Sequence, residues 1–180
     1  MKQKNWQRLG RFIAAHPKLV EWIIKNAQTK PYFDIDDYMK RWWLTPRFLL
    51  TRDRHGNLFP YEWVPQILKV RVQHILREDV DRHKHDHPSD NQSIILKGYY
   101  VEEDVFDRVK TLYAGQTVER RAETFHRIVE VPPEGVWTLW FLAEYRQKWG
   151  FLVGGRKIRY EEYLATRDAV EANYSDSKLE

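Results

Sequence analysis

The sequence predicts a mainly β domain, a sandwich or small barrel, with helices at both ends of the chain. Between residues 42 and 155, short apolar and β-branched segments recur at roughly ten-residue spacing and are separated by turn residues. The first 41 residues instead repeat apolar side chains at three- and four-residue spacing, as amphipathic helices do. We therefore divide the 180 residues into a helical amino-terminal extension packed on the barrel (1–41), the β domain (42–155), and a carboxy-terminal helix and tail (156–180).

The composition supports a packed core and excludes several kinds of chemistry. Hydrophobic residues make up 42% of the chain and aromatic residues 14%, which is enough for a core. No cysteine is present, so disulfides, thiolate metal sites and cysteine nucleophiles are excluded. The net charge of +4 comes from basic residues interleaved with acidic ones, so we expect no nucleic-acid partner. No secretory signal or membrane-length apolar run is visible, so we expect a cytoplasmic protein without a membrane partner.

Helices are predicted at the start of the chain. One helix ends at Pro17, and a second covers residues 18–27. Asp34, followed three residues later by Asp37, is typical of an N-cap and predicts a further short helix through Met39. Because short helices are marginally stable alone, we expect all of these to pack on the rest of the domain.

Strands are predicted where apolar segments lie between turn signals. The segments Arg54-His55-Gly56-Asn57 and Pro132-Pro133-Glu134-Gly135 are predicted turns. The expected strands cover residues 47–52, 67–77, 94–102, 106–112, 117–123, 125–131, 136–143 and 149–151, and a helix over 160–172 follows.

Three histidines stand at every second position just before a buried strand. In an extended segment, His83, His85 and His87 would all point to the same face. Neutral imidazole is a ligand for zinc, iron, nickel and copper. The pattern therefore indicates a metal site inside the β domain, and a solvated, histidine-rich strand end is the alternative.

This segment resembles the first sequence motif of the cupin superfamily. That motif reads His-x-His, three or four residues, Glu, six residues and Gly. Here His85 and His87 are followed by Asn91 at the glutamate position and then by Gly98.

The second cupin motif usually supplies a further histidine after a Pro-x-Gly turn. His126 stands at a suitable distance along the chain, but no such turn precedes it, and Glu130 replaces the usual asparagine. The resemblance covers residues 47–151. It implies a cupin-like double-stranded β-helix, or jelly-roll barrel, and it allows a homodimer.

The resemblance also implies a metal centre. His85, His87 and His126 would hold one divalent metal ion, with iron(II) favoured and zinc, nickel or manganese as alternatives. A three-histidine site with open positions is what thiol dioxygenases of the cupin superfamily use, so the expected function is a non-haem dioxygenase acting on a small molecule. Asn91, His83 or Glu102 is left open as a further ligand.

Two further side chains are candidates for catalysis. Tyr100 follows Gly98 by two residues and can reach the pocket. Arg71 and Gln73 line the pocket and bind an anionic substrate if their face of the 67–77 strand is the inner one; otherwise His74 is a core histidine. The alternation of residues in the sequence does not decide which face of the 67–77 strand is the inner one.

Arg120 and Arg121 lie near His126 in the sequence and are suited to binding anions. Our preferred interpretation is a solvated strand in which Glu119 and Glu123 are the local partners of these arginines.

Two other functions remain open. A metal-free cupin can act as a sugar epimerase or isomerase, with a histidine as general base and a tyrosine as general acid. The chain can also be a non-enzymatic binding or interaction module that uses its amino-terminal helices. The sequence lacks the G-x-x-x-x-G-K, G-x-S-x-G and G-x-G-x-x-G motifs, so nothing in it supports a P-loop protein, a serine hydrolase or a Rossmann enzyme.

Overall fold

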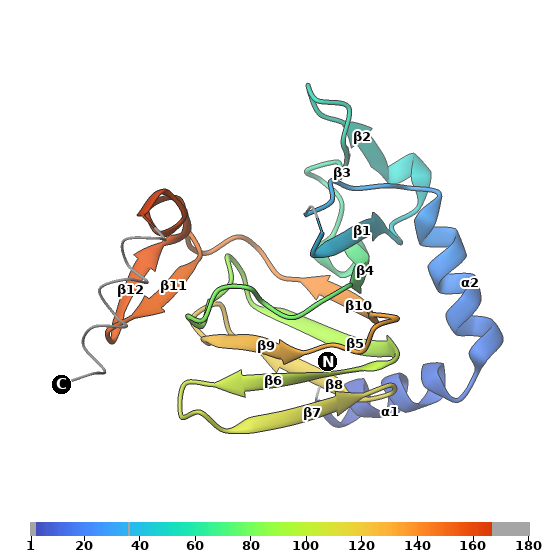
Figure 1. Ribbon diagram of the computed structural model, residues 1–180. Helices are drawn as coiled ribbons and strands as arrows, with labels where there is room; N and C mark the ends of the chain where they lie inside the picture. Colours follow the sequence, from blue (N-terminus) through green and yellow to red (C-terminus); the bar gives the residue numbers. More distant parts are fainter. Residues whose placement is uncertain (1–2, 36, 167–180) are drawn as a thin grey trace.

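In the computed structural model, two antiparallel β-sheets pack face to face, and two helices cover the outer side of one of them (Figure 1). The structure describes residues 3–35 and 37–166. The helices are α1 (Gln3–Ala14) and α2 (Pro17–Gln28), with single 3-10 turns η1 (Arg47–Leu49) and η2 (Gln66–Leu68). The strands are β1 (Met39–Trp43), β2 (Leu50–Arg52), β3 (Leu58–Pro60), β4 (Val70–Ile75), β5 (Asn91–Lys97), β6 (Tyr99–Asp104), β7 (Val109–Tyr113), β8 (Thr117–Arg120), β9 (His126–Glu130), β10 (Val136–Leu142), β11 (Gly150–Val153) and β12 (Arg156–Arg159).

The larger sheet has the strand order β1-β4-β10-β5-β8, and the smaller one has the order β7-β6-β9. His85 forms isolated bridges to His126 of β9 and to Phe151 of β11, so the smaller sheet continues through it toward the β11–β12 hairpin. The β2–β3 hairpin pairs with neither sheet (Figure 1) and packs against Trp43 of β1. The histidine-rich segment therefore lies between two elements of the smaller sheet.

Most of the core lies in two layers separated by the larger sheet, and a third, smaller cluster lies under the β2–β3 hairpin. Between the sheets, Ile95 and Val136 pack with Ile128 of the smaller sheet. On the outer side, Val72 and Ile94 belong to a cluster that also contains the buried residues of α1 and α2. Strand β5 is thus buried on both faces, which explains its unbroken apolar run from Ile94 to Leu96.

The predicted mainly β fold with jelly-roll packing of antiparallel sheets and helices at the ends is confirmed. The pairing of the described strands leaves two open sheets rather than a closed barrel. Residues 160–166 are helical, and the remainder of the predicted helix over 160–172 lies outside the described residues. No helix in the described part of the chain is long and apolar enough to cross a membrane. The division at residues 41 and 155 stays a prediction.

Gly98 is the glycine of the cupin-like motif, and it links the two sheets. It is the single residue between β5 and β6, and its φ of +82° is one that residues with a Cβ rarely adopt. A Cβ at this position would lie 2.9 Å from the carbonyl oxygen of Gly135. The sharp passage from one sheet to the other therefore requires glycine.

The predicted short helix after Asp34 is wrong. The chain makes a tight turn there, in which Ile35 pairs with Met39 and Asp37 has a φ of +53°. The carboxylate of Asp34 accepts a hydrogen bond from the backbone N–H of Arg41 instead of capping a helix. Pairing of β1 with β4 outweighs the local capping signal.

Three strand predictions also need correction. Residues 47–49 form η1 rather than the start of a strand, and β4 begins only at Val70, after η2. Residues 106–108 form a turn, because the carboxylate of Asp104 accepts hydrogen bonds from the N–H groups of Phe106 and Arg108. Strands β1, β3 and β12 are not among the predicted ones; β12 pairs with β11 across the Gly154-Gly155 turn.

Candidate metal centre

Three histidines converge at one end of the space between the sheets. One ring nitrogen each from His85, His87 and His126 lies within 4.8 Å of the other two. The Nε2 atoms of His87 and His126 are 2.8 Å apart. His126 is buried, whereas His85 and His87 are partly exposed. The cluster is therefore compact and accessible from one side.

Backbone pairing places these rings together. His85 and His126 exchange two backbone hydrogen bonds, of 2.8 and 3.0 Å, so their side chains project to the same face. His87 is two residues further along an extended segment and shares this face. His83 does not join the cluster; its Nδ1 lies 2.9 Å from the hydroxyl of Tyr163.

Two carboxylates lie next to Nδ1 atoms of the cluster. Oε2 of Glu102 lies 3.4 Å from Nδ1 of His126, and Oδ2 of Asp79 lies 3.5 Å from Nδ1 of His85. A carboxylate at Nδ1 favours the tautomer with the proton on that nitrogen, which leaves Nε2 as a free lone pair. The two carboxylates are therefore placed where they would favour Nε2 as the ligating nitrogen in both rings, and Nδ1 of His126 has no other hydrogen-bonding partner among the described residues.

The surroundings of the rings keep two of them neutral. Burial holds the pKa of His126 well below its usual range, and the nearby Arg120 and His85 act in the same direction. Burial also lowers the pKa of His87 strongly, with His126 and His85 as the next causes. Neutral imidazole is the form that binds metals, so these rings are ready to ligate at neutral pH.

Glu102 is held by Arg120, and Arg120 also contacts Tyr100. Arg120 forms an ion pair with Glu102 and donates a hydrogen bond of 3.1 Å to the hydroxyl of Tyr100. Burial raises the pKa of Tyr100, so its hydroxyl stays protonated at neutral pH. Tyr100 is thus connected to His126 through two intervening side chains.

The expectation of a solvated Arg120 with local glutamate partners is wrong, because its partner is Glu102 on the neighbouring sheet and its side chain is buried. The side chain of Glu102 is also largely buried. A cleft of about 380 Å³ opens beside Glu102, Arg120 and His126 and is bounded by β7 and β8. The carboxylate side of the cluster is therefore reachable by a small molecule.

The structure resolves which face of β4 is the inner one. Ile75 packs between the sheets, whereas Val72 packs toward the helices, so Arg71 and Gln73 face inward. Gln73 accepts a hydrogen bond from Thr138, and the guanidinium of Arg71 lies over the rings of Tyr32 and Trp43.

His74 points to the outer side of the larger sheet. Its ring stacks on that of Trp137, with 4.0 Å between the ring centres. His74 is therefore neither a ligand of the cluster nor a residue of the space between the sheets.

Asp86 lies between two histidines of the cluster, and no sequence pattern singles it out. Its side chain is 1% exposed and accepts hydrogen bonds from the N–H of Gly150 at 2.7 Å and from Gln147 at 2.9 Å. It also pairs with Lys157 of β12. Its partners are more than 60 residues away in the sequence, so only the folded chain reveals them.

The residues of the cluster fit a divalent metal ion. Imidazole nitrogens suit first-row metals, and the carboxylate behind a ligating histidine is the usual supporting arrangement. Asn91, at the position where cupins carry glutamate, is buried, and its Oδ1 has no hydrogen-bonding partner among the described residues. An unused oxygen ligand is thus present on the strand that follows the histidines.

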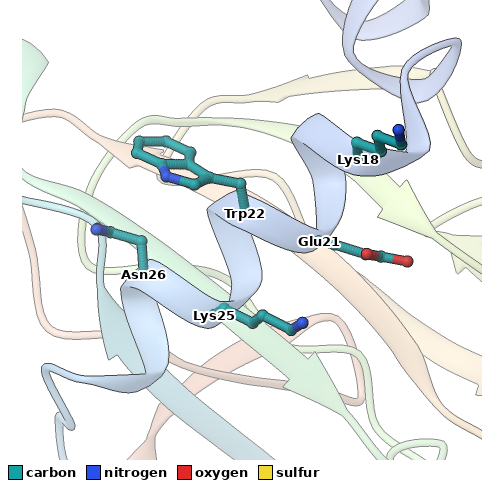
Figure 2. Close-up of a pocket in the computed structure, with 5 residues that line it drawn as sticks. All are labelled: Lys18, Glu21, Trp22, Lys25 and Asn26. Carbon is teal, nitrogen blue, oxygen red and sulfur yellow. The ribbon is translucent and has the colours of Figure 1, made fainter.

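A hollow on α2 is not a comparable site. Figure 2 shows that Lys18, Glu21, Trp22, Lys25 and Asn26 line it from successive turns of this one helix. None of these side chains belongs to the histidine cluster. The hollow is the solvent-exposed face of a helix whose other face is buried in the core.

Of the comparisons with known proteins, the one with solved structures finds similar proteins. No family model and no curated protein sequence matches the chain. KdgF from Halomonas sp. shares 15% identity, with 67% of this chain and 92% of that chain covered and a TM-score of 0.43. A putative mannose-6-phosphate isomerase from Ralstonia eutropha JMP134 shares 14% identity, with 63% and 92% covered and a TM-score of 0.42.

A cupin superfamily protein from Desulfitobacterium hafniense DCB-2 shares 11% identity, with 62% of this chain and 84% of that chain covered and a TM-score of 0.38. A protein described as a cupin is thus among the structures that are similar to this chain. A likeness at this level of identity concerns the arrangement of strands and carries no information on substrate or reaction.

Proposed function

We propose that the chain binds one divalent metal ion through His85, His87 and His126 and uses it in small-molecule chemistry resembling that of cupin iron(II) dioxygenases. The observation that carries the proposal is the convergence of three imidazoles, two of which have a carboxylate behind Nδ1. Iron(II) is the favoured ion, and zinc, nickel or manganese would suit the same nitrogens.

Three protein ligands leave coordination positions open, as catalytic metal sites require. A bound iron(II) would supply a template and an electron-transfer centre for oxygen and substrate.

The chain's own residues orient and shield the centre. Asp79 and Glu102 lie next to Nδ1 of His85 and His126, where they would favour ligation through Nε2, and Arg120 forms an ion pair with Glu102. The rings of Trp140 and Trp149 lie within 6.2 Å of those of His87 and His85, respectively, and restrict access of water. Tyr100, protonated and bound by Arg120, can act as a proton donor.

A metal-free isomerase or epimerase is the second candidate. The observation that favours it is the 2.8 Å contact between the Nε2 atoms of His87 and His126, because a hydrogen bond between the rings accounts for it without a metal. In that case a histidine would be the general base and Tyr100 the general acid.

Metal content separates the two candidates. Tag-free protein is incubated anaerobically with iron(II), desalted and analysed by mass spectrometry, beside a His85→Ala/His87→Ala variant and a His16→Ala/His55→Ala control that removes two exposed histidines. The proposal predicts about one equivalent of metal in the wild type and in the control, and none in the first variant. Absence of metal in all three would leave the isomerase or a binding module.

A further inference from the structure

Two buried N–H donors beside the histidine cluster have no acceptor. Nε of Arg71 and Nε1 of Trp140 are both inaccessible to solvent, and neither has a hydrogen-bonding partner among the described residues. Buried donors are nearly always paired, because loss of their hydration is costly. Two such donors close together indicate an acceptor that the chain itself does not supply.

The two donors are neighbours on the inner face of the larger sheet. Arg71 of β4 and Trp140 of β10 stand directly opposite each other in the antiparallel register. Side chains at such positions project to the same face, with Cβ atoms about 5 Å apart. The ring of Trp140 lies 5.4 Å from that of His87, so the pair borders the metal centre.

The acceptor must also satisfy a positive charge. The guanidinium of Arg71 lies 5.3 Å from the ring centre of Tyr32, and no carboxylate forms an ion pair with it in the described part of the chain. A second cation, Arg41, lies over the same ring at 4.9 Å. Burial lowers the pKa of Arg71 to about 10, so the side chain remains charged at neutral pH. The side chain of Tyr32 also forms a hydrogen bond with the guanidinium, but among the described residues Nε of Arg71 has no acceptor, and no carboxylate balances the charge.

We propose that Arg71 and Trp140 bind an oxyanion group of the substrate, a carboxylate or a phosphate, and place the rest of the molecule over His87. The inference rests on the proposed function and gives the substrate class for it: a small, anionic molecule. Arginine provides a charged donor and the indole a neutral one, a combination that fixes the orientation of an oxyanion. Arg71 thus acts in substrate binding.

The indole N–H of Trp140 provides a direct readout. Its ¹⁵N–¹H resonance is assigned with Trp140→Phe, which keeps an aromatic ring and removes the donor. Metal-free and zinc-loaded proteins are then titrated with propionate and, separately, with inorganic phosphate. We expect a saturable shift of this resonance with at least one of the two, and the one that binds identifies the oxyanion.

Variants test the charge. Arg71→Met should weaken the anion affinity by about tenfold or more, the effect of losing a charge-assisted hydrogen bond. Arg71→Lys should weaken the anion affinity less than Arg71→Met. If Arg71→Met does not fold, the affinity of Arg71→Lys is compared with that of the wild type instead. Arg156→Met, which removes an exposed arginine on β12, should leave the affinity unchanged.

The outcomes separate this inference from the metal proposal. No shift of Trp140 with either anion, or equal affinity in the wild type and the folded Arg71 variant, would overturn the oxyanion site even if zinc binds. A saturable shift that depends on Arg71 in protein that takes up no zinc would support the oxyanion site and remove the metal proposal.

Discussion

Replacing Asp86 should disturb the metal centre although this residue touches no metal ligand with its side chain. Its carboxylate fixes the backbone between His85 and His87 by accepting hydrogen bonds from Gly150 and Gln147 and by pairing with Lys157. Removing one partner of a buried ion pair typically costs about 3–5 kcal/mol of folding free energy. The side chain of Lys157 is 29% exposed and can turn toward solvent, so we expect Asp86→Ala to cost about 3 kcal/mol, the lower end of that range.

Urea denaturation of the metal-free protein, followed by tryptophan fluorescence, measures this cost. The midpoint should fall for Asp86→Ala with little change in the slope. Asp86→Asn keeps the shape and one acceptor and should cost less, about 1.5–3 kcal/mol.

Zinc titration of the same variants should show about 10- to 100-fold weaker binding, as for residues that support metal ligands. Glu161→Ala, which removes the exposed partner of Lys148, is the matched control and should change neither quantity measurably. An Asp86→Ala protein within about 0.5 kcal/mol of the wild type would refute the reasoning, because that is the effect of an ordinary surface substitution.

Three further predictions follow from the same contacts. Glu102→Gln should weaken zinc binding about 10- to 100-fold in calorimetry, while the exposed Glu119→Gln should not; equal affinities would mean that the carboxylate does not support His126. Gly98→Ala should lower the folding free energy by roughly 2 kcal/mol or more in urea denaturation, because alanine is strained at a φ of +82°, and an unchanged midpoint would contradict this. Burial lowers the pKa of His74 in the folded protein, so the unfolded state binds more protons and the folding free energy falls as the pH drops through about 6.5. His74→Gln should therefore flatten this part of the plot of urea midpoint against pH. Parallel plots for the variant and the wild type would contradict this prediction.

The sequence predicted the histidine segment because its signal is local. Alternation in an extended segment placed His85 and His87 on one face, and the structure brings them together. His126 was found only through the cupin resemblance, since nothing near it in the sequence indicates a ligand. His83 has the same parity but binds Tyr163, because the ends of a short extended segment can meet different neighbours.

The supporting residues could not be predicted, because pairing distant in the sequence creates their roles. Asp79 follows the predicted strand over 67–77 without any local sign of a role, and Glu102 meets His126 only because β6 pairs with β9. Alternation along β4 allowed Arg71 to face either side of the larger sheet. The packing of Val72 against the helices shows that Arg71 lies on the inner side. The capping signal at Asp34 failed for the same reason, since β1 pairs with a strand about 30 residues away.

The most direct test of the metal centre is a crystal structure of protein loaded anaerobically with iron(II), with anomalous diffraction recorded on both sides of the iron absorption edge. We predict one strong anomalous peak about 2.0–2.2 Å from Nε2 of His85, His87 and His126, with the Nδ1 atoms of His85 and His126 facing Asp79 and Glu102. An iron peak at any other place, or rings in contact with no iron between them, would contradict the account.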